Sequence, residues 1–195
     1  MRRALFLVLA ERLMEIVSVP LTSREITVRP ATRSDLPSIL EIYNEAVLNT
    51  TASADYEPQT LEARRAWFAA HLEDNYPVFV AEDERGRIVG WSSLSRYHAR
   101  FGYRFTVENS VYVAAEQRGQ GIGKRLIPPL IESARERGWH AMLASISADN
   151  EASIRLHAAF GFAPVAQFKE IIYKFDRWLD VIYMELLLDG AKGGA

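Results

Sequence analysis

The segment Gln117-Arg118-Gly119-Gln120-Gly121-Ile122-Gly123-Lys124 decides how this chain of 195 residues is interpreted. It follows a strand-like run that ends at Val113, and it opens a helical pattern that stops at Gly138. Glycines let backbone N–H groups approach a ligand closely. The start of a helix attracts negative charge, and Arg118 and Lys124 add side-chain cations. The segment therefore predicts a binding site for a pyrophosphate.

The spacing of the three glycines excludes two common nucleotide loops. Gly119, Gly121 and Gly123 alternate with other residues, whereas a dinucleotide loop has the pattern Gly-x-Gly-x-x-Gly. The segment also lacks the Gly-Lys-Ser/Thr ending of a nucleoside-triphosphate loop. A glycine-rich turn that binds no ligand is the alternative that the glycines alone leave open.

The hydrophobic pattern on either side of this segment predicts alternating strands and helices. Before it we expect, in order, a strand at 26–29, a helix capped by Ser34, a helix at 61–72, and strands at 77–82, 88–94 and 105–113. After it we expect a helix, a strand at 141–147, a helix at 150–160, and strands at 163–172 and 181–188. This order is typical of an α/β (α+β) fold with a single sheet and helices on its faces. Pro128-Pro129 predicts a kink in the helix after the glycine-rich segment.

The length and pattern predict one domain over residues 24–190. Residues 1–23 are interpreted as an N-terminal extension, with Met14 as an alternative start, and residues 191–195 as a flexible tail. The apolar run near Met1 is short and is soon followed by charged residues, which disfavours both a signal peptide and a membrane span. We therefore expect a cytoplasmic protein.

Composition excludes several classes of function. The net charge of −2 gives no sign of a nucleic-acid partner or of a polybasic membrane surface. The absence of cysteine excludes disulfides, zinc-thiolate sites and a cysteine nucleophile. His71, His98 and His140 show no metal-ligand spacing, so we predict no metal.

Two motifs together resemble the GNAT superfamily of N-acetyltransferases. The first is Arg118-x-x-Gly121-x-Gly123 after a strand. The second is the run from Asn150 to His157, which is followed by Gly161-Phe162. The order of elements is similar to that family from about residue 26 to residue 188. The resemblance implies a mostly antiparallel central sheet flanked by helices, with a splay between its fourth and fifth strands.

The same resemblance implies acetyl-CoA as the co-substrate. It places the pantetheine arm in the splay and the carbonyl of the thioester near the backbone N–H of Val113, in an oxyanion-hole role. The residues that it assigns to the cofactor are Val111, Tyr112, Val113, Arg118, Gly119, Gln120, Gly121, Ile122, Gly123, Lys124, Asn150 and Ser153.

Glu108 is the candidate general base. An amine reaches the enzyme mainly as ammonium, so a carboxylate must remove a proton before the amine can attack the thioester. From its position alone, Glu108 could equally be a solvated glutamate at a strand edge. The run from Thr106 to Val113 resembles phosphinothricin acetyltransferases, in which the matching glutamate is a proposed base.

His157 is the second candidate catalytic residue. Many relatives have a tyrosine at this position as the acid that protonates the thiolate, and histidine can act as an acid near neutral pH. In the phosphinothricin group the matching histidine is itself proposed to be catalytic. The sequence leaves open whether His157 is an acid, a base or a structural hydrogen-bonding group.

The loop from Arg96 to Arg104 interleaves arginines with aromatic residues, and it precedes Glu108. A solvated loop is the plain alternative, but an arginine beside the catalytic strand could clamp a carboxylate. The subfamily resemblance assigns Arg100, Tyr103 and Tyr56 to the acceptor site. It also implies a homodimer whose acceptor sites lie near the subunit boundary.

Three functions therefore remain at the level of the sequence. The first is acetyl transfer to a small amino-acid-like amine, such as phosphinothricin, methionine sulfoximine or methionine sulfone. The second is acetylation of a protein N-terminus or lysine, and the third is a module that binds acetyl-CoA without catalysis. The arginine-rich loop favours the first over the second, and the pair Glu108 and His157 disfavours the third.

Overall fold

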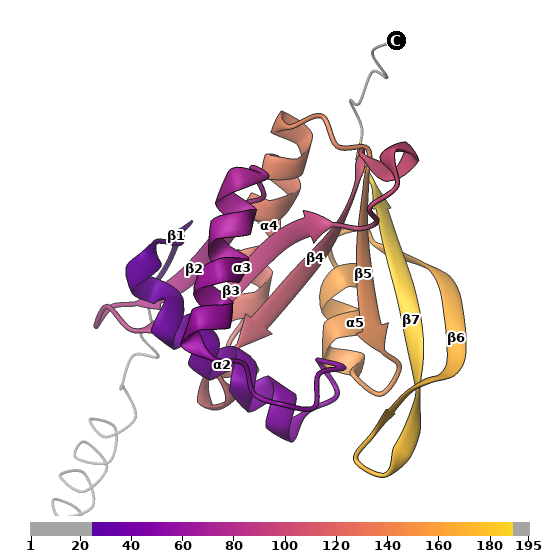
Figure 1. Ribbon diagram of the computed structural model, residues 1–195, viewed down its shortest axis with the longest axis horizontal. Coiled ribbons are helices and arrows are strands. Elements are labelled where there is room, and N and C mark those ends of the chain that lie inside the picture. Colours follow the sequence, from indigo (N-terminus) through magenta and orange to yellow (C-terminus); the bar gives the residue numbers. More distant parts are fainter. Residues whose placement is uncertain (1–24, 189–195) are drawn as a thin grey trace, which may run out of the picture.

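A seven-stranded mixed sheet forms the centre of the structure, a computed structural model that describes residues 25–188 (Figure 1). The strands are β1 (Ile26–Pro30), β2 (Val78–Asp83), β3 (Ile88–Arg96), β4 (Thr106–Val113), β5 (Ala141–Ser147), β6 (Ala163–Lys174) and β7 (Arg177–Leu187). The α-helices are α2 (Leu36–Asn49), α3 (Leu61–Glu73), α4 (Ile122–Glu136) and α5 (Glu151–Ala158). Short 3-10 helices are η1 (Arg33–Asp35), η2 (Phe101–Tyr103) and η3 (Ala115–Gln117).

The strands lie across the sheet in the order β1-β2-β3-β4-β5-β7-β6. Neighbouring strands are antiparallel, except that β4 and β5 are parallel. Their registered pairs stop at Glu108 and Leu143, and the rest of β4 has no registered partner in β5. We call this point of divergence the fork. The predicted splay between the fourth and fifth strands is thereby confirmed.

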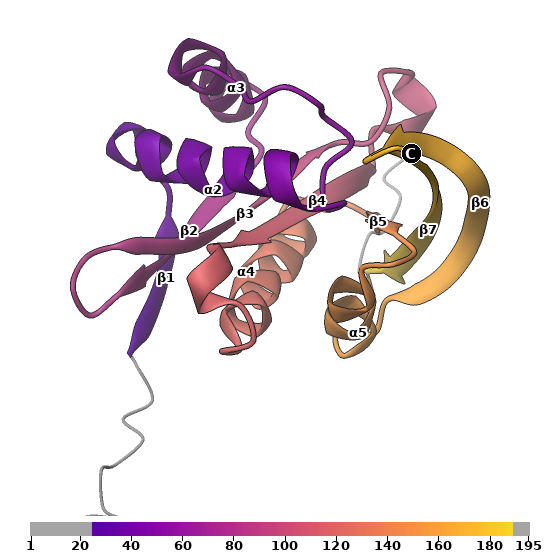
Figure 2. The ribbon, with the colours of Figure 1, turned by 90° about the horizontal axis from the view of Figure 1, so that it is seen from below.

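Helices cover both faces of the sheet (Figure 2), with α2 and α3 on one face and α4 and α5 on the other. One core cluster packs Ile39 and Phe68 against Trp91 of β3. A second core cluster packs Leu130 of α4 against Met142 of β5. Since side chains alternate along a strand, successive residues of β4 face these two layers in turn.

Two local expectations differ from the structure. Ser34 lies inside η1 and does not cap a helix; Thr32 takes the cap position, in a capping box with Asp35. The Asp35 carboxylate also accepts two hydrogen bonds from Arg29, at 2.8 and 2.9 Å, which ties the turn to β1. The helix α4 runs through Pro128 and Pro129 without interruption, so the expected kink does not break it.

The closing hairpin is longer than its sequence suggests. β6 and β7 are connected by Phe175 and Asp176, which both have a positive φ, of 52° and 56°. Two such residues in a two-residue hairpin loop are typical of a type I′ turn. The expected extension 1–23 and tail 191–195 lie outside the described residues. Within residues 25–188 no helix is long and apolar enough to cross a membrane.

Candidate active site at the fork

A cavity of about 880 Å³ lies between the end of β4, the start of α4 and the start of α5. Of the twelve predicted cofactor residues, all except Gln120 line it: Val111, Tyr112, Val113, Arg118, Gly119, Gly121, Ile122, Gly123, Lys124, Asn150 and Ser153. The amide of Gln120 instead donates to the carbonyl oxygen of Glu116 at 3.2 Å. Segments that are distant in the sequence thus form one site.

The three glycines of the loop have different physical roles. Gly119 and Gly121 have φ values of +77° and +80°, a conformation that costs other residues energy, and the space beside them is open. Gly121 is the N-cap of α4 and lies in the cavity wall. The N–H groups of the first turn of α4 therefore face the cavity. A Cβ at Gly123 would lie 2.8 Å from Cδ2 of Leu156, so this glycine allows α4 to approach α5 closely.

Several cations surround the glycine loop. Lys124 is exposed and lines the cavity. Arg118 forms an ion pair with Glu45 of α2 and donates to the carbonyl oxygen of Val113 at 3.2 Å, so its guanidinium braces the loop. Arg155 and Arg177 also line the cavity, although the sequence does not single them out. This charge distribution suits a polyanion.

The backbone of β4 provides donors inside the fork. The N–H of Ala114 donates to the carbonyl oxygen of Val89 in the β2–β3 hairpin at 3.0 Å. Alternate residues of an antiparallel strand point to the same neighbour. The N–H groups of Val111 and Val113 therefore point the other way, toward β5, where β4 has no registered partner. They can reach a carbonyl oxygen that lies in the fork.

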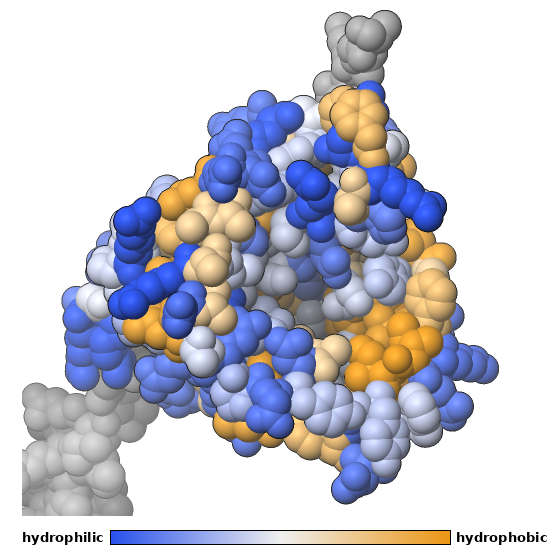
Figure 3. All heavy atoms as spheres, viewed as in Figure 1, coloured by the Kyte–Doolittle hydropathy of each residue, from blue (hydrophilic) through white to orange (hydrophobic). Residues whose placement is uncertain are grey.

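A second cavity, of about 210 Å³, occupies the fork and adjoins the first (Figure 3). The two share wall residues, among them Thr51, Ala52, Val111, Asn150 and Ser153. Figure 3 shows a hollow between the helical side of the molecule and the side that carries β6 and β7. Together the cavities form one path from the glycine loop to the start of the fork.

Glu108 lies in the wall of the second cavity and is half-buried. Burial raises the pKa of its carboxyl above the usual value. A raised pKa makes the carboxylate a better proton acceptor. The position and the pKa of Glu108 both suit the role of a general base.

His157 lines the same cavity, but its ring is only 3% exposed. Its Nδ1 lies 2.8 Å from the carbonyl oxygen of Ser153, and its Nε2 lies 2.9 Å from Oδ1 of Asn109. Burial lowers the pKa of His157, while the contact with Ser153 opposes this change. Both ring nitrogens are therefore engaged within the protein.

Asn109 is not among the residues that the sequence predicts. It follows Glu108, is buried, and reaches both β5 and α5 through its side-chain amide. The only signal in the sequence is a polar residue on the face of β4 that otherwise packs against the helices α4 and α5. That signal could have marked it as a hydrogen-bonded buried group.

The segment 50–56, which we call the strap, covers the junction of the two cavities. Thr51 and Ala52 of the strap line both cavities. The hydroxyl of Tyr112 donates to the carbonyl oxygen of Ala52 at 3.2 Å, and that of Thr51 to Asp149 at 2.7 Å. Asp149 in turn forms an ion pair with Arg177. The strap is therefore tied to β4, to the loop before α5 and, through Asp149, to β7.

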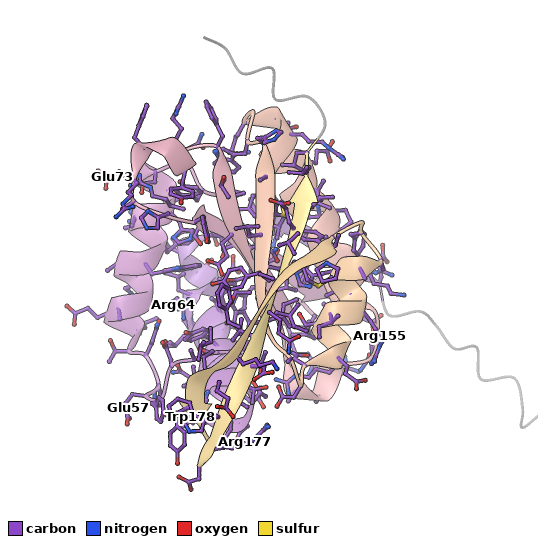
Figure 4. The ribbon with its side chains drawn as sticks, turned by 90° about the vertical axis from the view of Figure 1, so that its right-hand side faces the viewer. Glu57, Arg64, Glu73, Arg155, Arg177 and Trp178 are labelled. Carbon is purple, nitrogen blue, oxygen red and sulfur yellow. The ribbon has the colours of Figure 1, made fainter. Side chains whose placement is uncertain are left out.

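The hairpin of β6 and β7 holds the strap from the other side. Lys174 is buried, and its Nζ donates to the carbonyl oxygens of Thr50 at 3.0 Å and Ser53 at 2.7 Å. Figure 4 shows Arg177 and Trp178 at the hairpin end, beside the loop that carries Glu57. Tyr56 is the one strap residue that the sequence analysis expected at the site, and Lys174 was not expected there.

The structure does not place the three predicted acceptor residues in either cavity wall. Arg100 and Tyr103 lie on the exposed loop that contains η2, and Tyr56 donates its hydroxyl hydrogen to the carbonyl oxygen of Tyr173. The ring of Tyr103 lies 5.7 Å from that of Tyr97, which directly follows Arg96, the residue of β3 that pairs with Val107 of β4. Tyr97 thus connects the predicted acceptor loop to the fork.

Comparison with known proteins gives a consistent result. The family model of the acetyltransferase (GNAT) domain matches residues 28–183. An L-methionine sulfoximine/L-methionine sulfone acetyltransferase of Pseudomonas paraeruginosa is 46% identical over 85% of this chain and 96% of its own. A phosphinothricin N-acetyltransferase of Streptomyces coelicolor is 40% identical over 83% of this chain and 95% of its own length. A solved structure from Salmonella typhimurium, which contains its cofactor acetyl-CoA, is 41% identical to this chain and has a TM-score of 0.85. The match covers 88% of this chain and 98% of the other.

Proposed function

Because the chain belongs to the GNAT family of acetyltransferases, we propose that it moves the acetyl group of acetyl-CoA directly to the primary amine of a small amino-acid-like acceptor. Phosphinothricin, methionine sulfoximine and methionine sulfone are the proposed acceptors, because relatives of 40–46% identity carry these names. The observation that carries the proposal is the position of Glu108 in a fork cavity that adjoins the cavity of the glycine loop.

Each step of the proposed acetyl transfer can be assigned to residues at the two cavities. The N–H groups around Gly119 and Gly121 bind the pyrophosphate together with Lys124, and α5 supports the pantetheine arm at Asn150. Glu108 takes a proton from the ammonium, directly or through a water, and the free amine attacks the thioester carbon. The N–H groups of Val111 and Val113 stabilise the oxyanion. The C–S bond then breaks, and the thiolate leaves with its electron pair and takes up the second proton, which the attacking nitrogen loses as it becomes an amide nitrogen.

For the acceptor we keep Arg100, Tyr103 and Tyr56 as the proposed contacts. The contact between Tyr103 and Tyr97 supports this placement, because Tyr97 follows the end of β3, where Ser95 pairs with Glu108. A guanidinium can bind a carboxylate through two parallel hydrogen bonds, which suits an amino-acid acceptor. His157 keeps its proposed place in the active site, and its two internal contacts favour the hydrogen-bonding role among those that the sequence leaves open.

We also propose a homodimer and a cytoplasmic location. The last hairpin exposes large apolar side chains: Val165, Phe168, Ile171, Tyr173, Phe175 and Trp178. Figure 3 shows apolar residues gathered on the side of the molecule that carries β6 and β7. A contiguous apolar surface of this kind is typical of a protein interface. The use of acetyl-CoA and the absence of cysteine suit the cytoplasm.

Thiol release from acetyl-CoA in the presence of a panel of amines tests the proposal. The panel contains phosphinothricin, methionine sulfoximine, methionine sulfone, polyamines and peptides with free N-termini or lysines. We expect turnover with the small amino-acid-like acceptors, and N-acetylated products by mass spectrometry. Turnover with peptides alone would support protein acetylation instead, and turnover with none of the amines would contradict the proposed function.

A further inference from the structure

We propose that Asn109 is a positioning residue for acetyl transfer, because its amide fixes the fork between β4 and β5 while His157 holds that amide in place. The inference rests on the proposed function, and it assigns a role to a residue that does not itself touch either substrate. It also gives His157 a specific partner.

The first contact is at the root of the fork. Glu108 and Leu143 form the last registered pair of β4 and β5. The side-chain Nδ2 of Asn109, the next residue, donates to the carbonyl oxygen of Leu143 at 2.9 Å. Asn109 is 7% exposed, so this hydrogen bond lies in a low-dielectric environment, where losing it costs more than at the surface. The amide therefore ties the two strands where they begin to diverge.

The second contact fixes the amide. Because Nδ2 faces the carbonyl oxygen of Leu143, Oδ1 must face the other way, and it lies 2.9 Å from Nε2 of His157. In the neutral imidazole Nε2–H donates to Oδ1 of Asn109, and Nδ1 accepts from the hydroxyl of Ser153 at 3.4 Å. An edge-to-face contact with Phe162 at 5.1 Å also holds the ring. A chain of hydrogen bonds thus runs from β5 through Asn109 to α5.

The position of Asn109 affects the two proposed catalytic groups of β4, the carboxylate of Glu108 and the backbone N–H donors. Glu108 precedes Asn109, and the N–H of Val111 follows two residues later. A shift of the fork would move the carboxylate and the oxyanion donors relative to the thioester. A misplacement of about 1 Å at a reacting centre can cost about 100-fold in rate. The glycine loop lies at the far end of β4, so the affinity for coenzyme A should change little.

A double-mutant cycle tests the coupling. Asn109→Leu and His157→Leu remove the two members of the chain with little change in volume. We expect each to lower kcat by about 10- to 100-fold, and the double variant to lower it no further than the worse single variant. The Kd for coenzyme A should stay within about twofold. Losses that multiply, or a normal kcat in Asn109→Leu, would overturn the proposal.

The variant Ser92→Ala is the control for the general effect of losing a buried hydrogen bond. Ser92 is buried and donates to the carbonyl oxygen of Leu126 at 3.2 Å; it lies on β3 beside Val111, outside the hydrogen-bond chain through Asn109. This variant should keep a normal kcat even if its melting temperature falls. If Asn109→Leu does not fold, Asn109→Asp removes the donor to Leu143 while keeping an oxygen toward His157, and it should lower kcat as well. A normal kcat in Asn109→Asp would contradict the proposal.

His157→Gln separates positioning from proton transfer. Glutamine can donate a hydrogen bond to Oδ1 of Asn109, but it does not titrate. We expect kcat within about threefold of the wild type and an unchanged pH profile, whereas His157→Leu loses activity. If His157→Gln loses a limb of the pH profile, or is as inactive as His157→Leu, the positioning role is wrong.

Hydrogen exchange distinguishes failure of this inference from failure of the proposed function. The amides of residues 106–113 should exchange faster in Asn109→Leu and His157→Leu than in the wild type and in Ser92→Ala. This readout needs no acceptor. Faster exchange in a protein that acetylates no amine would support the role of Asn109 in fixing the fork and would contradict the proposed function. Unchanged exchange would contradict that role of Asn109 whether or not the protein acetylates an amine.

Discussion

Nζ of Lys174 lies 2.7 Å from the carbonyl oxygen of Ser53, although the two residues are 121 positions apart. The same Nζ donates to the carbonyl oxygen of Thr50 at 3.0 Å. One buried cation in the last hairpin therefore holds both sides of Thr51 and Ala52, which line the two cavities. The closing hairpin of the fold thereby contributes to the site, although β6 is an edge strand of the sheet.

Lys174→Met should loosen the strap. The methionine fills a similar volume but leaves two carbonyl oxygens without their donor, which costs about 1–3 kcal/mol for each group left unsatisfied. We expect a lower melting temperature and a lower kcat/KM for the acceptor, measured by thermal unfolding and by thiol release.

Lys169→Met in the same strand is the matched control, because Lys169 is exposed. It should leave both quantities unchanged. If Lys174→Met keeps the kcat/KM of the wild type, the strap does not shape the site.

Glu108→Gln should stabilise the protein at alkaline pH. Burial raises the folded-state pKa of Glu108 above its unfolded value. Such a group favours folding below the unfolded pKa of about 4.5, and this contribution is lost as the pH rises through the folded pKa. At pH 8 the ionised buried carboxylate is a cost that glutamine lacks.

The melting temperatures of wild type and Glu108→Gln at pH 8 and pH 4 measure this effect. The variant should melt higher at pH 8, and the difference should shrink at pH 4. Glu132→Gln, at an exposed position of α4, serves as the control. A wild type that is the more stable of the two at pH 8 would show that the Glu108 carboxylate is stabilised in the fold.

Gly123→Val should separate helix packing from ligand binding. The new side chain would meet Leu156 at a distance that forces this side chain or α5 to shift, and such overpacking costs about 1–3 kcal/mol. Since Asn150 and Ser153 stand at the start of α5, the Kd for acetyl-CoA should rise as well. Gly102→Ala meets no atom within 4 Å and should change neither the stability nor the Kd. Normal acetyl-CoA affinity in Gly123→Val would mean that α5 does not shape the site.

Ile171→Glu should disrupt the proposed dimer. Ile171 is 52% exposed among the apolar residues of the last hairpin. A charge buried there at an interface would lack a partner and would be costly. Light scattering coupled to size exclusion should show a dimer for the wild type and a monomer for the variant. A wild type that is monomeric at micromolar concentration would contradict the homodimer.

Most of the fold could be predicted from the sequence because the hydrophobic period changes clearly along the chain. The strand at 141–147 and the helix at 61–72 agree with β5 and with α3 to within one residue. The closing hairpin was underestimated, because Phe175-Asp176 lacks the glycine or asparagine that usually marks a turn with positive φ. The Thr32 cap was misplaced because Ser34 offers the same chemistry two residues later.

The residues predicted to bind the cofactor lie in two continuous motifs, and all except Gln120 line one cavity, while their role in binding stays a prediction. Asn109, Lys174 and the strap residues other than Tyr56 were not predicted, because their roles depend on contacts between residues that lie 34 to 124 positions apart. The structure likewise places Arg100 and Tyr103 outside the described cavities, so their role as acceptor contacts stays a prediction.

The pH profile of kcat/KM for acetyl transfer to methionine sulfone, in wild type and in Glu108→Gln, tests the role of the fork most directly. The wild type should lose activity as the pH falls, with a midpoint above the usual pKa of a glutamate, because burial raises the pKa of Glu108. Glu108→Gln should be slower by about 10²- to 10⁴-fold and should lack that limb. Full activity of Glu108→Gln across the pH range would show that the carboxylate in the fork is not the base.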